Sequence, residues 1–179
     1  MTVPQKEAAD ALEHVANAGQ RSATAYRYQK FSPYLFLWGA IWIVGFTVSY
    51  LLPAAWQVWL ALVPAGILAS IWIDKRSRSS RGWKYGVECL AIFLFIFAVY
   101  TILPPRSAAQ GSALFPLVVA LLYVLFGVSM RAARITVLGF VLGALTVGGF
   151  LWLPQYFLLW MAAVGGGTLI LGGSWLRTV

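Results

Sequence analysis

The chain of 179 residues is 61% hydrophobic and only 10% charged, and its net charge is +8. Soluble domains carry about 25% charged residues, so this composition indicates an integral membrane protein. One cysteine, Cys89, and one histidine, His14, exclude an internal disulfide, a cysteine-rich metal site and a haem bound by two histidines. The positive charge favours an anionic lipid leaflet as the partner rather than nucleic acid, because the basic residues are spread over separate loops without a nucleic-acid-binding motif.

Residues 1–33 are polar and form an N-terminal arm, which we expect to be a short amphipathic helix on the cytoplasmic side. Small and apolar residues recur there at roughly helical spacing, at Ala8, Leu12, Val15, Gly19 and Tyr26. Acidic residues precede basic ones, which suits the dipole of a helix. The pattern of a secretory signal peptide is missing, so we expect the arm to be retained. It either lies on the membrane surface or docks a partner or a second copy, and Ser32-Pro33 is expected to end it.

Residues 34–179 contain uncharged stretches of about 20 residues, the length that crosses a hydrocarbon core of about 30 Å. They predict an all-α, polytopic domain of six transmembrane helices at about 34–52, 54–73, 86–103, 113–130, 135–153 and 155–175. Leu-Pro recurs about every 50 residues, at 52–53, 103–104 and 153–154. This period predicts three antiparallel hairpins, each turning at its proline. Trp59 and Trp160 lie at the same offset after their prolines, as do Gly66 and Gly167.

Lysine and arginine residues fall almost entirely on one side of the predicted spans. Of the 13 in the chain, only Arg106 lies on the other side. Basic residues stay cytoplasmic, so we expect a multi-pass protein of the cell (inner or plasma) membrane with both termini in the cytoplasm. The basic segment after the second span is expected to contact lipid head groups or a partner through Lys75, Arg76, Arg78, Arg81, Trp83 and Lys84.

Glu88 is the only acidic residue placed to enter a span, close to the start of the third helix. Either it pairs with Lys84 or a neighbouring basic residue at the interface, or it is a proton or cation gate. Aromatic stripes, a proline inside the second span and a run of glycines supply the remaining candidates for a cavity: Trp38, Trp42, Ser49, Pro64, Phe93, Tyr100, Gly165, Gly166 and Gly167. Such residues also serve as core or as lipid contact.

Glycines in the last two spans predict close helix packing, at Gly139, Gly143 and Gly148. Gly165, Gly166 and Gly167 have two interpretations. They either pack tightly against a neighbouring helix, or they break the helix and present carbonyl groups to a solute.

The sequence contains no catalytic dyad, metal motif or phosphate-binding loop, so we expect neither an enzyme nor a cofactor. The middle of each span lacks charged and amide side chains, which disfavours ion-coupled transport. One hypothesis is a passive channel or facilitator for a small, mostly uncharged solute, acting alone or as a homo-oligomer. Its layout is similar to that of small six-span channels for urea or acetate, without their signature motifs. The alternative is a non-catalytic membrane subunit of a larger complex (anchor, assembly factor or regulator) acting through its arm and basic loop. A third is the substrate-binding subunit of a larger importer.

Overall fold

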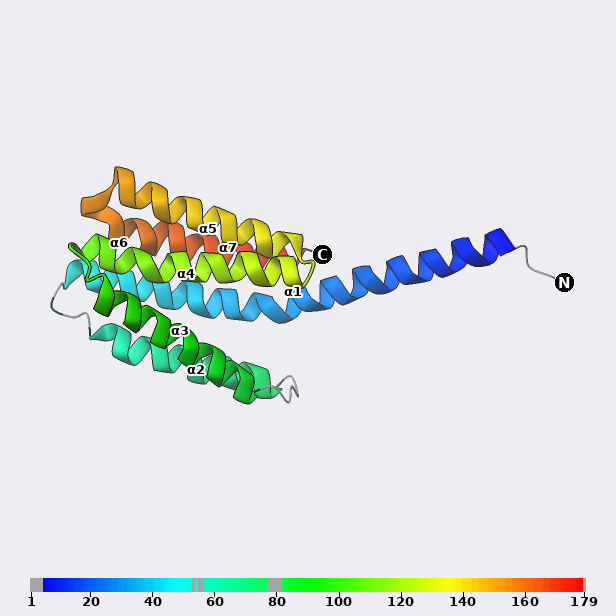
Figure 1. The fold of residues 1–179 in the computed structure, drawn as a ribbon, viewed down its shortest axis with the longest axis horizontal. Coiled ribbons are helices and arrows are strands. Elements are labelled where there is room, and N and C mark those ends of the chain that lie inside the picture. The colour runs from blue at the N-terminus through cyan, green and yellow to red at the C-terminus, as the bar shows by residue number, and fades with distance from the viewer. Residues whose placement is uncertain (1–4, 53, 55–56, 77–81, 179) are drawn as a thin grey trace.

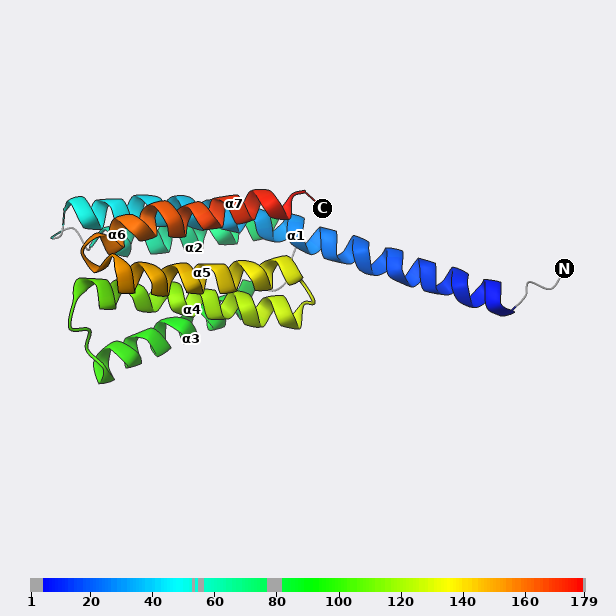
Figure 2. The ribbon, with the colours of Figure 1, turned by 90° about the horizontal axis from the view of Figure 1, so that it is seen from above.

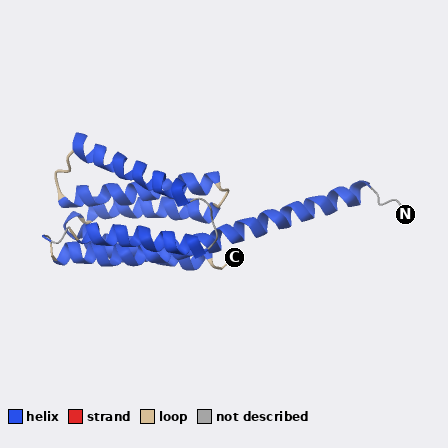
Figure 3. Cartoon of the chain, turned by 90° about the horizontal axis from the view of Figure 1, so that it is seen from below, coloured by secondary structure: helices blue, strands red, loops and turns tan. Residues whose placement is uncertain are grey.

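The computed structural model describes residues 5–52, 54, 57–76 and 82–178. Within these ranges the chain is almost entirely helical and contains no strand, which confirms the all-α prediction (Figure 3). The helices are α1 (Gln5–Leu51), α2 (Val58–Arg76), α3 (Gly82–Ile102), α4 (Ala108–Ser129) and α5 (Ala133–Trp152). The last helical rod comprises a 3₁₀ turn (Pro154–Tyr156), α6 (Phe157–Trp160), a π-helical turn (Met161–Gly165) and α7 (Gly166–Leu176).

Four helical segments of the described chain are long and apolar enough to cross a membrane. They are Ser22–Leu51, Ala108–Ser129, Ala133–Trp152 and Pro154–Leu176. The second and third predicted spans correspond to shorter apolar stretches, Val58–Asp74 and Leu90–Ile102. Large apolar side chains cover the outside of these helices, with Ile102, Trp152 and Leu171 all more than 70% exposed. Apolar helices with apolar outer surfaces indicate a membrane-embedded protein.

The N-terminal arm and the first span form one continuous helix, so the predicted break at Ser32-Pro33 is wrong. Pro33 lies inside α1, although a proline removes one backbone hydrogen bond of a helix. Contacts with α7 compensate on both sides of it: Ser32 and Leu35 are fully buried, and the Ser32 hydroxyl donates to the Gly173 carbonyl at 2.8 Å. The N-terminal part of α1 therefore projects beyond the bundle (Figures 1 and 2).

The closest helix packing occurs between the predicted hairpins rather than within them. α4 packs along α5, and α1 packs along α7, whereas α2 packs less extensively on α1 and α3 contacts α4 only locally. Figure 2 shows α3 diverging from α4 along its length. The core between α1, α4, α5 and the last rod is filled by side chains that are at most 1% exposed: Leu35, Trp42, Ile135, Leu142, Phe157, Met161 and Leu169.

Candidate functional site

Trp42, expected as a cavity wall, lies in the centre of the bundle. It is 1% exposed, and its ring meets Phe46 edge-on at 5.8 Å and Phe115 at 6.0 Å between centroids. Packed aromatic rings of this kind stabilise a core. The structure therefore places Trp42 among core residues, and the aromatic stripe of α1 faces protein at this position.

Two of the next three candidates, Trp38 and Ser49, lie at the contact between α1 and α2, and the third, Pro64, lies outside it. Trp38 lies beside Gly66, where a Cβ atom would come 3.2 Å from the Trp38 ring. The Ser49 hydroxyl accepts a hydrogen bond from the Trp59 indole N–H at 3.0 Å. Pro64 is exposed, and α2 continues through it. Trp38 and Ser49 thus lie at the contact that holds α2 on α1, and the three residues do not converge on a common site.

The three glycines of the last span take different positions. Gly165 ends the π-helical turn and lies against Met161, and a Cβ atom there would come 3.5 Å from the Trp42 ring. Gly166 crosses Gly39 of α1, whereas a Cβ atom on Gly167 would meet nothing within 4 Å. Small residues allow two helix backbones to approach closely. The first two glycines thus lie at contacts with α1, and Gly167 faces open space.

The glycines of α5 also differ in what they contact. A Cβ atom on Gly139 would come 2.7 Å from the Ala120 carbonyl oxygen of α4, so the two backbones nearly touch. At Gly143 the nearest atom is the Ala120 Cβ at 3.6 Å, an ordinary contact. Gly148 faces only Trp152 of its own helix. Among these three predicted packing positions, Gly139 is the one where the contact with α4 depends on the absence of a side chain.

Eight predicted site residues lie outside the side chains that the structure describes. They are Glu88 and Phe93 of the cavity prediction, together with Lys75, Arg76, Arg78, Arg81, Trp83 and Lys84 of the head-group prediction. Their roles stay predictions.

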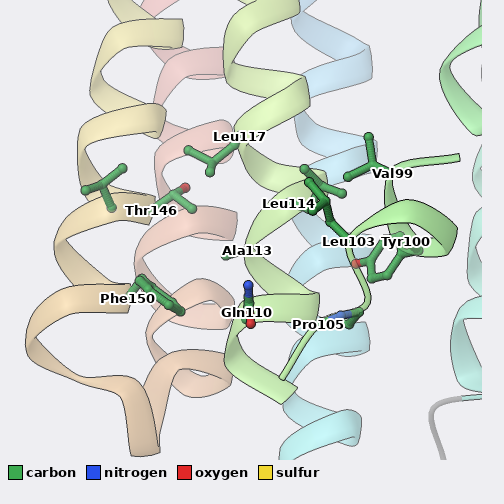
Figure 4. A pocket seen from close by; sticks show the side chains of 11 residues that line it. Val99, Tyr100, Leu103, Pro105, Gln110, Ala113, Leu114, Leu117, Thr146 and Phe150 are labelled. Atoms are coloured by element: carbon green, nitrogen blue, oxygen red, sulfur yellow. The ribbon is translucent and has the colours of Figure 1, made fainter. Parts of the chain in front are cut away.

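Tyr100 lines a cavity of about 340 Å³ between the end of α3, the start of α4 and the end of α5 (Figure 4). Most of the lining is apolar, from Val99, Leu103, Pro105, Ala113, Leu114, Leu117, Val147 and Phe150. Gln110 and Thr146 complete the wall. The Tyr100 hydroxyl donates a hydrogen bond to the Gly111 carbonyl, which ties α3 to α4 beside the cavity. Of the predicted cavity residues with described side chains, Tyr100 is the one found here.

An ion pair between α1 and α2 escaped the sequence analysis. Lys30 Nζ lies 3.5 Å from Asp74 Oδ1, and the Asp74 side chain is 9% exposed. Asp74 Oδ1 and Ser70 Oγ, one turn apart on α2, are buried without a hydrogen-bond partner in the described structure. A smaller cavity of about 280 Å³ adjoins Lys30, lined also by Tyr26, Gln29, Pro33, Tyr34 and Ile73. The sequence feature that could have indicated this pair is Asp74 itself, an isolated carboxylate at the end of an apolar helix.

Three arginines make hydrogen bonds at one end of the bundle, two of them to the C-terminal ends of helices, and the sequence pattern does not predict these contacts. Arg27 of α1 donates to the Met130 carbonyl at the end of α4 at 2.6 Å. Arg134 of α5 donates to the Trp175 carbonyl in the last turn of α7, also at 2.6 Å. Arg177 donates to the Ser32 hydroxyl at 2.9 Å. Helix C-termini leave carbonyl groups unpaired and carry partial negative charge, so guanidinium groups stabilise them.

Comparison with protein-family models, with curated proteins and with solved structures finds no match.

Proposed function

We propose that this protein is a non-catalytic membrane subunit that holds a rigid helix, the N-terminal part of α1, in the cytoplasm for a partner protein. The observation that carries this proposal is the continuity of α1, which runs from Gln5 to Leu51 without a break. A helix that is part of a packed bundle cannot swing independently of it. A partner bound to the arm would therefore be held at a fixed place and angle relative to the membrane.

The arm carries an unpaired apolar stripe. Leu12 and Val15 are each 71% exposed, and Tyr26 is 64% exposed on the same helix face. Exposed apolar residues at spacings of three and four are the usual contact face for another helix. Glu13 and His14, on a different face, are also exposed, so a partner helix would meet apolar residues flanked by polar ones.

The base of the arm is fixed by the arginine contacts. Arg27 reaches α4, Ser32 is bonded to both Gly173 and Arg177, and Tyr28 is 5% exposed. These contacts gather Arg27, Arg134 and Arg177 at one end of the bundle, which supports placing that end in the cytoplasm. In this arrangement α2 and α3 also cross the inner membrane, giving six spans. The apolar stretch of α2, 17 residues from Val58 to Asp74, reaches the lower limit for a span.

The facilitator hypothesis draws less support from the geometry. Trp42 and the surrounding core side chains fill the space between α1, α4, α5 and the last rod. The cavity beside Tyr100 lies on the side of the bundle and is lined mainly by hydrocarbon, which is a poor environment for a small polar solute. A permeation path would then have to form between copies in an oligomer.

The experiment is co-purification from native membranes with the full chain and with a deletion of residues 2–20. This deletion stops before Arg27 and Tyr28, so the bundle keeps its contacts. We expect the partner to be lost with the deletion and with Leu12→Ser/Val15→Ser, and to be kept with His14→Ser on another face. Proteoliposomes of the purified chain should show no uptake of urea or acetate. Unchanged partner recovery without the arm, or solute uptake above empty vesicles, would refute the proposal.

A further inference from the structure

The cavity beside Tyr100 plays no part in the arm or in the arginine contacts. Along α4 it extends from Gln110 to Leu117, about 10 Å at 1.5 Å per residue. Figure 4 shows Ala113 between the α4 and α5 walls, with Gln110 and Pro105 toward one end and Leu117 toward the other. The cavity is therefore a slot that runs inward from the end of the bundle where Arg106 lies.

The side-chain oxygen atoms of the wall already have hydrogen-bond partners within the protein. The Thr146 hydroxyl donates to the Leu142 carbonyl of its own helix at 2.8 Å, and the Tyr100 hydroxyl donates to the Gly111 carbonyl. The Gln110 side-chain oxygen accepts from the Arg106 backbone N–H at 2.8 Å. A polar ligand would gain little from these engaged groups and would lose its hydration. The inner part of the slot is suited to hydrocarbon.

The slot is large enough for an alkyl chain and is accessible from the side. An apolar cavity of roughly 150 Å³ stays dry and binds benzene, and this one has about 340 Å³. Two of its wall residues reach the outer surface, since Leu117 is 37% and Val147 is 45% exposed. In a membrane, that surface faces lipid chains, so a chain can enter without passing through water.

The charge at the mouth indicates the head group. Arg106 is exposed, directly follows the wall residue Pro105, and is the one basic residue predicted at this end of the bundle. Guanidinium groups bind phosphate through paired, charge-assisted hydrogen bonds. We propose that the slot binds one acyl chain of an anionic phospholipid, with its phosphate beside Arg106 and Gln110.

The test is native mass spectrometry of the full chain, released from nanodiscs of phosphatidylglycerol or of phosphatidylcholine with the same acyl chains. We expect one retained lipid, with phosphatidylglycerol preferred roughly tenfold, the size of one charge-assisted contact. Arg106→Gln should remove the preference but leave the chain bound.

Two variants block the slot from opposite walls. Ala113→Phe fills it from α4, and Val147→Trp narrows it from the exposed side of α5 without entering the core. Both should lose the retained lipid, whereas Ala144→Phe, exposed on α5 outside the slot, should keep it. Circular dichroism checks that each variant is folded. If Ala113→Phe does not fold, the result for Val147→Trp decides. Lipid retention that is equal in all three variants, equal for the two lipids, or replaced by detergent alone would overturn the proposal.

Discussion

Gly39 of α1 and Gly166 of α7 face each other so closely that a Cβ atom on either would lie 3.0 Å from the carbonyl oxygen of the other. Each position is also closed by an isoleucine of the opposite helix, Ile170 at 2.8 Å and Ile43 at 2.6 Å. In lipid, helices associate through close packing rather than through the hydrophobic effect. This reciprocal contact therefore holds the last helix on the helix that carries the arm.

Gly166→Ala should destabilise the bundle by about 1 to 3 kcal/mol, the usual effect of inserting a methyl group where backbone and side chains leave no room. Gly167→Ala is the matched control, because a Cβ atom there meets nothing within 4 Å. It should be neutral or stabilising by up to about 1 kcal/mol, since alanine favours the helix. Unfolding in sodium dodecyl sulfate, followed by circular dichroism, measures both. Equal effects of the two substitutions would contradict the close contact.

Arg131→Gly should raise stability by about 1 kcal/mol. Arg131 has a φ of 51°, a left-handed conformation that is unfavourable for residues with a side chain. It forms the turn after α4, where Ala132 N–H donates to Gly127 at 2.7 Å and Arg131 N–H donates to Val128 at 3.0 Å. Arg131→Ala removes the positive charge but keeps a side chain in the left-handed conformation, so it tests the effect of the charge alone. It should leave stability nearly unchanged. A loss of stability in the glycine variant would mean that this turn has another conformation.

Arg134→Gln should loosen the end of α7. The guanidinium donates to the Trp175 carbonyl and to the Thr178 hydroxyl at 3.0 Å, and it lies 5.1 Å from the Trp175 ring. Losing these contacts should cost about 1 to 2 kcal/mol. Amide hydrogen exchange of residues 174–178 should accelerate, while the middle of α7 stays protected. Arg131→Gln removes the same charge from the neighbouring turn and should leave that exchange unchanged.

The effects of Asp74→Asn and Lys30→Met on the free energy of unfolding should be non-additive, because the two side chains form an ion pair between α1 and α2. Removing either partner leaves the other partly buried and unpaired, which costs more than the pair contributes. The double variant should therefore be more stable than the sum of the two single losses predicts, by about 1 kcal/mol. A double-mutant cycle in detergent measures this coupling. Strict additivity would show that the two side chains do not interact.

The recurring Leu-Pro pattern predicted the ends of three helices well. Leu52, Leu103 and Leu153 directly follow the last residues of α1, α3 and α5. The equivalence of Trp59 and Trp160 also extends to their contacts. Both indole N–H groups donate to the preceding helix, to Ser49 at 3.0 Å and to the Leu145 carbonyl at 2.9 Å. Both rings lie against a glycine of that helix, Gly45 and Gly149.

Contacts between distant segments could not be read from such patterns. Pro33 predicted a helix end, but packing on α7, more than 130 residues away in sequence, keeps the helix continuous. Trp42 was expected to line a cavity, but it lies in the core. A stripe of aromatic residues in the sequence does not show whether it faces a cavity or packed protein. Likewise, nothing local to Asp74 identifies Lys30 as its partner. The cavity beside Tyr100 depends on how three helices diverge, which periodicity does not encode.

The continuity of α1 is the central claim, and a distance between two spin labels tests it most directly. The labels are placed at Leu12→Cys in the arm and Val44→Cys on the exposed face of the bundle, in a Cys89→Ser background. Thirty-two residues of unbroken helix separate these positions, which gives about 45 to 48 Å between Cα atoms at 1.5 Å per residue. A narrow distribution there, by double electron–electron resonance, is the predicted result. A broad distribution, or one near about 36 Å as for a right-angle turn at Pro33, would contradict the account.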